Sequence, residues 1–99
     1  MFKVEILPLA LEDITSIANW YNEQQKGLGL RFANTLRYDT QKIKKNPNAF
    51  VKRYKKVHTY VMSDFPFLIH YLIEENQKKI IITAVFHTSL NPEKWNKRS

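Results

Sequence analysis

The chain has 99 residues and a formal net charge of +7 at pH 7, a size that indicates a single domain over residues 1–99 with one modest hydrophobic core. Hydrophobic residues make up 43% of the chain and charged residues 25%, a mixture that excludes a disordered or fibrous protein. The lack of cysteine excludes disulfides, thiolate metal sites and cysteine nucleophiles. Because the apolar runs are short and the first residues show no secretory pattern, we expect no membrane span, no membrane partner and a cytoplasmic location.

The charge balance points to an anionic partner. Sixteen Lys and Arg residues face nine Asp and Glu residues. Nucleic acid, a ribosomal surface and an acidic peptide are all compatible with this excess, as is a soluble surface that is simply basic. Charge alone does not distinguish these alternatives.

The first half of the chain reads as one strand and two helices. Residues 2–7 alternate apolar and polar side chains, which predicts a short half-buried strand. Residues 9–27 carry apolar side chains at spacings of three and four and predict a helix that Gly27 and Gly29 end. Residues 30–47 predict a second helix in the same way. The connection is short, so we expect an antiparallel helical hairpin.

The second half reads as β structure. Residues 50–62 predict one long strand, residues 65–75 a second and residues 80–87 a third, joined by short turns and therefore antiparallel. Residues 91–98 predict a helical turn or an ordered tail. The fold class is thus α+β, in the order β-α-α-β-β-β, with a helical hairpin packed on one face of an antiparallel-dominated sheet.

A basic run lies at the start of the predicted strand 50–62. Because alternate residues of a strand share a face, Lys52, Tyr54 and Lys56 are expected on one side. Arg53 and Lys55 are then expected on the other. The run is interpreted as a phosphate-contacting rim with an aromatic ring available for stacking. The alternative is a charged edge strand, since lysines protect edges against sheet-to-sheet association.

Three histidines are the candidates for general acid or base catalysis near neutral pH, namely His58, His70 and His87. Their spacing is not that of metal ligands, so no metal site is predicted. Each is interpreted first as hydrogen-bonded to a nearby backbone carbonyl. For His87, which ends the last strand, the alternative is a catalytic acid or base. In the predicted strand, the His87 side chain lies on the same face as those of Ile81, Thr83 and Val85.

The remaining candidates are one tryptophan and two carboxylate pairs. Trp95 is interpreted either as a cap over an open edge of the core or as a ring that stacks on a base or anchors a partner. Glu12 with Asp13, and Glu74 with Glu75, are adjacent in sequence, so their side chains point apart and form no acid/base pair. The chain has no GxGxxG, P-loop or GxSxG motif, and we expect no cofactor.

Five stretches, which together cover nearly the whole chain, carry a resemblance to a known family: ALEDITSIANWY (10–21), GLGLRFANTL (27–36), NPNAF (46–50), FPFLIHYLIE (65–74) and IIITAVFHTSLNPEKWNKR (80–98). Their order and spacing resemble the RelE/ParE superfamily of type II toxin–antitoxin toxins, with the ParE-like branch most similar. The resemblance implies a bacterial toxin of the plasmid-stabilisation, growth-inhibiting kind that a cognate antitoxin silences. RelE-like members are ribosome-dependent endoribonucleases, whereas ParE-like members block DNA gyrase and are not nucleases.

The chain departs from the RelE-like nucleases at the cations that the resemblance implies. Leu68 and Leu90 stand where many relatives carry arginine, and Thr59 and Val61 stand where the nucleases place lysines. A nuclease of this kind must stabilise an extra negative charge on a pentacoordinate phosphate, which leucine does not do. We hypothesise a substitute set in which His87 is the base or acid and which consists of His87, Lys94, Trp95, Lys97 and Arg98.

Three functional hypotheses follow. The first is a non-enzymatic toxin that binds a macromolecular target, DNA gyrase, and that an antitoxin neutralises by folding an acidic segment across it. The second is a ribosome-dependent mRNA endoribonuclease with His87 as the catalytic residue. The third is an inactive toxin-like binding module. The oligomeric state stays open. In the first hypothesis the target or nucleic-acid surface consists of Lys52, Arg53, Lys55, Lys56, Lys94, Trp95, Lys97 and Arg98.

Overall fold

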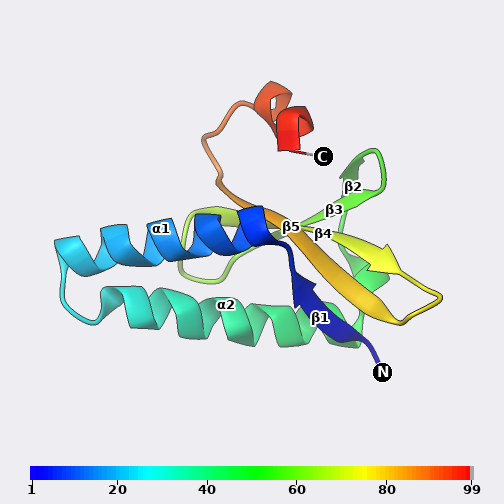
Figure 1. The fold of residues 1–99 in the computed structure, drawn as a ribbon, viewed down its shortest axis with the longest axis horizontal. Helices are drawn as coiled ribbons and strands as arrows, with labels where there is room; N and C mark the ends of the chain where they lie inside the picture. The colour runs from blue at the N-terminus through cyan, green and yellow to red at the C-terminus, as the bar shows by residue number, and fades with distance from the viewer. Residues whose placement is uncertain (99) are drawn as a thin grey trace.

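The structure, a computed structural model, describes the backbone of residues 1–98 and the side chains of residues 1–95 (Figure 1). Among these residues no helix is long and apolar enough to cross a membrane. The elements are β1 (Lys3–Ile6), α1 (Pro8–Gln24), α2 (Leu28–Lys45), the short 3-10 helix η1 (Pro47–Ala49), β2 (Lys52–Tyr54), β3 (Val57–Val61), β4 (Phe67–Glu74), β5 (Lys79–His87) and the 3-10 helix η2 (Pro92–Arg98).

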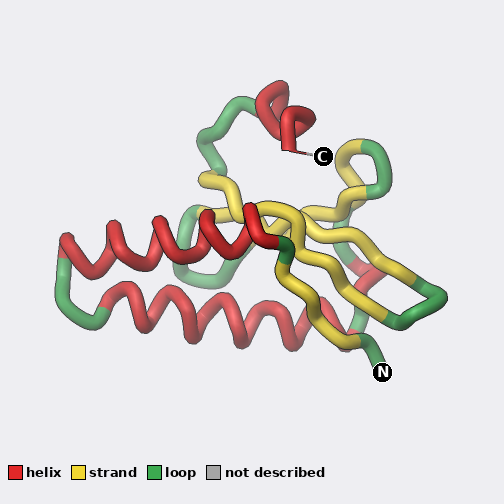
Figure 2. The backbone as a smooth tube through the Cα atoms, viewed as in Figure 1, coloured by secondary structure: helices red, strands yellow, loops and turns green. Residues whose placement is uncertain are grey.

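The strands form one sheet in the order β1-β5-β4-β3-β2. β1 pairs with β5 in parallel, and the other neighbouring pairs are antiparallel. Figure 2 shows the two helices running side by side as a hairpin that extends beyond the sheet. The predicted α+β class, with a helical hairpin on a mostly antiparallel sheet, is confirmed.

The hairpin depends on two glycines with different roles. Gly27 takes φ 88° and is the residue from which α2 starts, a conformation that costs glycine little. Gly29 lies inside α2, so the prediction that it ends the first helix is wrong. An added Cβ at Gly29 would lie 2.3 Å from the carbonyl oxygen of Ala18, and the Gly29 amide donates to Asn22 Oδ1 at 2.8 Å. The helices therefore approach each other closely at this point.

The core lies between the hairpin and the sheet and is largely aromatic. Phe32 of α2 packs edge-on against Phe65 and Phe67, with ring centroids 5.3 and 5.6 Å apart. Tyr21 of α1 lies 5.1 Å from Phe65. Edge-to-face contacts of this kind add to the free energy gained from burial. The sheet contributes fully buried residues to the same core, including Ile69, Tyr71, Ile80 and Ile82.

The stretch predicted as one long strand is a hairpin of β2 and β3. Lys55 adopts φ 48°, and Lys55 with Lys56 forms the turn. The predicted placement of these two lysines on alternate strand faces is therefore wrong. The turn leaves both lysines exposed. Tyr54, the last residue of β2, packs near His70, with ring centroids 5.7 Å apart.

A β-bulge changes the phase of the last strand. Thr83 is an extra residue in β5, because consecutive residues of β4 pair with β5 residues on either side of it. Val85, two residues after Thr83, donates its backbone amide to Asp13 Oδ2 of α1 at 3.0 Å. This bond connects the bulged part of β5 to the helical hairpin. His87 is consequently in phase with Val85, as predicted, but not with Ile81 or Thr83.

Candidate macromolecular interface

The C-terminal segment covers the sheet face that the helices leave open. Trp95 of η2 is only 6% exposed, and its ring centroid lies 4.7 Å from that of His70 and 5.6 Å from that of Tyr54. His70 alternates along β4 with residues of the helix-side core, so Trp95 lies on the opposite face. The ring acts as a structural cap, the first of its two interpretations. The second interpretation, in which Trp95 stacks on a base or anchors a partner, requires an open ring face, and the packing on His70 and Tyr54 covers the ring.

The two histidines in the middle of the sheet make structural contacts. His70 is fully buried, and its Nδ1 lies 3.0 Å from the Tyr54 hydroxyl. His58 Nδ1 donates to the carbonyl oxygen of Phe50 at 2.8 Å, and its ring stacks on Tyr71 at 5.2 Å. The carbonyl-bonded interpretation is thus confirmed for His58, whereas His70 bonds to a hydroxyl. Among the described residues, no group of histidines and carboxylates is arranged to hold a metal ion.

His87 is exposed at the end of β5, beside the turn that leads to η2. The Ser89 amide donates to His87 Nδ1 at 3.0 Å, and the Ser89 hydroxyl lies 2.7 Å from the same nitrogen. An amide only donates, so Nδ1 is the acceptor and the proton of the neutral ring lies on Nε2. The ring borders a groove of about 310 Å³ between α1 and β5 whose described lining includes Glu12 and Asp13 but no lysine or arginine.

Exposed basic side chains lie on β2 and its turn, on η2 and also on α2. All four lysine and arginine side chains of the basic run are exposed. The contact between Tyr54 and Trp95 places η2 against β2, and Lys94, also exposed, belongs to η2. Figure 1 shows η2 and the β2–β3 hairpin next to each other. Lys97 and Arg98 also belong to the predicted target surface, but their side chains lie outside those that the structure describes. The cations of β2 and its turn, hereafter the β2 cations, are Lys52, Arg53, Lys55 and Lys56.

The sheet's open face carries apolar or small side chains where the nucleases of the superfamily are implied to carry cations. Thr59 and Leu68 are buried there, with exposures of 5% and 7%, and Val61 is exposed. Ala84 of β5 is buried opposite His70. The central strands β3 and β4 contain no lysine or arginine, so within the sheet the basic run lies at the β2 edge rather than at the centre.

A buried carboxylate was not among the predicted site residues. Asp39 of α2 is fully buried and accepts hydrogen bonds from Tyr60 Oη at 3.2 Å and from the Ser63 amide and hydroxyl, each at 2.8 Å. Burial and the neighbouring Asp39 carboxylate raise the pKa of Tyr60. The sequence carried one sign of this role, because Asp39 falls on the apolar line between Leu36 and Ile43. Asp39 ties the loop between β3 and β4 to α2.

A match to a family model identifies the family. The family model described as "ParE toxin of type II toxin-antitoxin system, parDE" matches residues 4–92. The chain belongs to the ParE toxin family. The predicted resemblance to the ParE-like branch is therefore confirmed. A sequence comparison with curated proteins gave no match.

The fold of this ParE-family toxin also occurs in a solved structure titled "Chromosomal ParDE TA system from P. aeruginosa". The two chains are 16% identical and superpose with a TM-score of 0.77, and the match covers 90% of this chain and 98% of that one. At this level of identity the match concerns the fold.

Proposed function

We propose that this ParE-family chain arrests growth by binding DNA gyrase and that a cognate antitoxin neutralises it. Membership of the family supports the toxin role. The observation that carries the binding mechanism is the position of the β2 cations, which are exposed beside η2 while the open sheet face is apolar and capped by Trp95. Clustered cations of this kind raise the association rate with an anionic surface and orient the encounter.

Binding has more support than RNA cleavage. Cleavage requires cations that contact the reacting phosphate as its charge develops. The groove beside His87 is lined by carboxylates and apolar side chains, with no lysine or arginine among the described ones. His70, the histidine at the centre of the open face, is fully buried.

The proposal is tested by DNA supercoiling with purified gyrase, relaxed plasmid and ATP. The double variant Lys52→Glu/Arg53→Glu changes two exposed β2 cations, and Lys3→Glu/Lys26→Glu makes the same change in charge at two exposed residues elsewhere. We expect the first variant to need about ten times more protein for half-inhibition, and the second to stay within about twofold of the unmodified chain. Equal losses in both variants would show that only net charge matters.

The alternatives give different results in the same experiments. Unchanged supercoiling at high excess of the chain would exclude gyrase as the target. Cut transcripts in a cell-free translation reaction, lost in His87→Ala, would establish the ribosome-dependent endoribonuclease. No growth arrest on induction would indicate the inactive binding module.

A further inference from the structure

A hollow of about 390 Å³ lies where the C-terminal end of α2, the first residues of the chain and the turn joining β4 to β5 meet (Figure 1). Its described lining contains three lysines and no carboxylate. The volume falls within the range of small-molecule sites, which is about 300–1,000 Å³. The lining consists of Met1, Phe2, Gln41, Lys44, Lys45 and Lys78.

The backbone around this hollow is tied to the rest of the fold. Phe2 packs against the hydrophobic core and is half-buried, which leaves part of its surface accessible. The amide of Lys3, the next residue, donates to the carbonyl oxygen of Lys78 at 2.8 Å and so fixes the turn beside β1. Lys44 and Lys45 belong to the last turn of α2. Three separate elements thus hold one aromatic ring and three lysines around the same hollow.

The positive charge of the hollow exceeds what the end of α2 requires. The C-terminal end of a helix carries a negative charge equivalent to about half an elementary charge. Lys44 and Lys45 supply two full positive charges at that end, and Lys78 adds a third from the turn. The complementary ligand is therefore an anion with more than one negative charge.

Lys78 is held only weakly by its present partners. Its ammonium lies 5.4 Å from the centroid of the Phe2 ring and 3.8 Å from Glu75 Oε1. The side chains of Lys78 and Glu75 are 60% and 61% exposed, and at such exposure a cation–π contact or an ion pair contributes little. A phosphate that binds the Lys78 ammonium therefore displaces little and leaves the face of the Phe2 ring open to an aromatic group.

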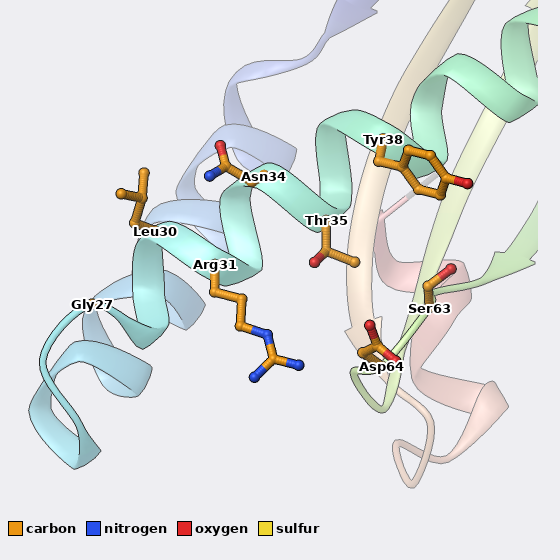
Figure 3. A pocket seen from close by; sticks show the side chains of 8 residues that line it. All are labelled: Gly27, Leu30, Arg31, Asn34, Thr35, Tyr38, Ser63 and Asp64. Atoms are coloured by element: carbon orange, nitrogen blue, oxygen red, sulfur yellow. The ribbon is translucent and has the colours of Figure 1, made fainter.

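A second groove beside α2 lacks this charge pattern. It has a volume of about 420 Å³ and lies between α2 and the loop joining β3 to β4. Figure 3 shows Arg31 of the helix and Asp64 of the loop on opposite sides of it. Because the Asp64 carboxylate repels a polyanion, this groove provides a control surface of mixed charge on the same helix.

We propose that the hollow between α2, Phe2 and the β4–β5 turn binds a nucleotide. The phosphates contact Lys44, Lys45 and Lys78, and the base packs on Phe2. Lysine is a common phosphate ligand, and any base stacks on an aromatic ring. The inference goes beyond the proposed binding of gyrase, because none of these residues belongs to the β2 cations.

A nucleotide matches the hollow better than an acidic peptide does. A polyphosphate concentrates several negative charges in one small group, whereas the carboxylates of a peptide carry one charge each and are spread along the chain. Three lysines around one hollow suit the concentrated charge. The same chemistry occurs in a free nucleotide and in an unpaired nucleotide of a strand, and a competition experiment distinguishes these two sources.

Isothermal titration calorimetry with ATP in magnesium-free buffer tests the inference. We expect ATP to bind the unmodified chain about tenfold more tightly than tripolyphosphate, which lacks the base that stacks on Phe2. The variant Lys44→Glu/Lys45→Glu reverses two charges of the hollow and should raise the Kd for ATP about tenfold or more. The charge-matched control, Lys26→Glu/Arg31→Glu, lies at the other end of the hairpin and should change the Kd by less than about twofold.

The variant Lys78→Gly separates ligand binding from folding. Lys78 has a φ of 53°, a left-handed conformation that glycine adopts at lower cost than lysine does. We therefore expect the Tm of Lys78→Gly to equal or exceed that of the unmodified chain. The Kd for ATP should nevertheless rise about fivefold or more, because a cation that contacts phosphate is lost. Unchanged ATP binding in this variant would refute the assigned role of Lys78.

Three results would overturn the nucleotide site. They are the absence of ATP binding to the unmodified chain, equal affinity for ATP and tripolyphosphate, and equal loss of binding in the two double variants. If the site holds, competition between ATP and a short oligothymidylate identifies the source of the nucleotide. Displacement of ATP by a lower concentration of the oligonucleotide indicates an unpaired strand, and the reverse order indicates a free nucleotide.

Discussion

The substitution Gly29→Ala tests the close contact between the two helices. Alanine normally stabilises a helix interior by about 1 kcal/mol relative to glycine. At Gly29 we expect the opposite sign, because the added Cβ would lie 2.3 Å from the carbonyl oxygen of Ala18 and 2.7 Å from the Asn22 side chain. Ala18 contributes a backbone atom of α1, so relief of the clash requires movement of the helix itself.

The size of the effect follows from three contributions. Overpacking of a tight contact costs about 1–3 kcal/mol. Displacement of Asn22 loses the 2.8 Å hydrogen bond that it accepts from the Gly29 amide, which is worth about 1 kcal/mol. The gain in helix propensity offsets about 1 kcal/mol. The net expectation is a loss of about 2 kcal/mol in the free energy of unfolding, equivalent to a fall of roughly 8–16 °C in Tm for a chain of this length.

Urea unfolding followed by circular dichroism measures this loss. Gln41→Ala is the matched control, because Gln41 is an exposed residue of the same helix, and we expect its free energy of unfolding to change by less than about 0.5 kcal/mol. A Gly29→Ala chain as stable as the unmodified one, or more stable, would refute the contact between α1 and α2.

Three further predictions concern the loop, the cap and the pH dependence of stability. Asp39→Ala leaves buried donors without their acceptor, including the Ser63 amide, and should lower the free energy of unfolding by about 3 kcal/mol in urea titrations. An unchanged unfolding midpoint would contradict the role of Asp39 in holding the loop to α2. Trp95 is 6% exposed and Trp20 is 56% exposed, so the fluorescence of Trp20→Phe should be blue-shifted relative to that of Trp95→Phe, and coincident spectra would rule out the cap. Burial raises the pKa of Tyr71 above its usual 10.0, so the unfolded chain loses this proton first, and the free energy of unfolding should fall as pH rises above 10.0. Tyr71→Phe should make this fall with pH shallower. An unchanged slope would count against the burial of Tyr71.

The periodicity of the sequence was enough to predict the layers of the fold. Apolar spacing of three and four residues predicted both helices, and the short connection predicted their hairpin. Both helices begin and end within three residues of the predicted limits. The signal was strong there because each helix buries one continuous stripe against the sheet.

Local backbone features of the sheet were not predictable in the same way. The run of β-forming and basic residues around Lys55 contains no glycine, proline or asparagine, so nothing in it marked the turn that Lys55 makes with a positive φ. The bulge at Thr83 depends on pairing with β4 and on the bond from Val85 to Asp13. Both contacts join residues far apart in the sequence.

The site residues were predicted in part. Composition identified the β2 cations, and the structure places them beside η2. The packing of Trp95 on His70 and Tyr54 was beyond the sequence, because it depends on where the C-terminal segment folds back.

The central claim is that this ParE-family toxin acts by binding DNA gyrase and not by cutting RNA. The most direct measurement is induction of the chain in bacteria that carry a reporter plasmid, with plasmid topology and transcript integrity determined from the same cells. The account predicts growth arrest with loss of negative supercoiling and full-length transcripts. Growth arrest with cut transcripts and unchanged plasmid topology would contradict it.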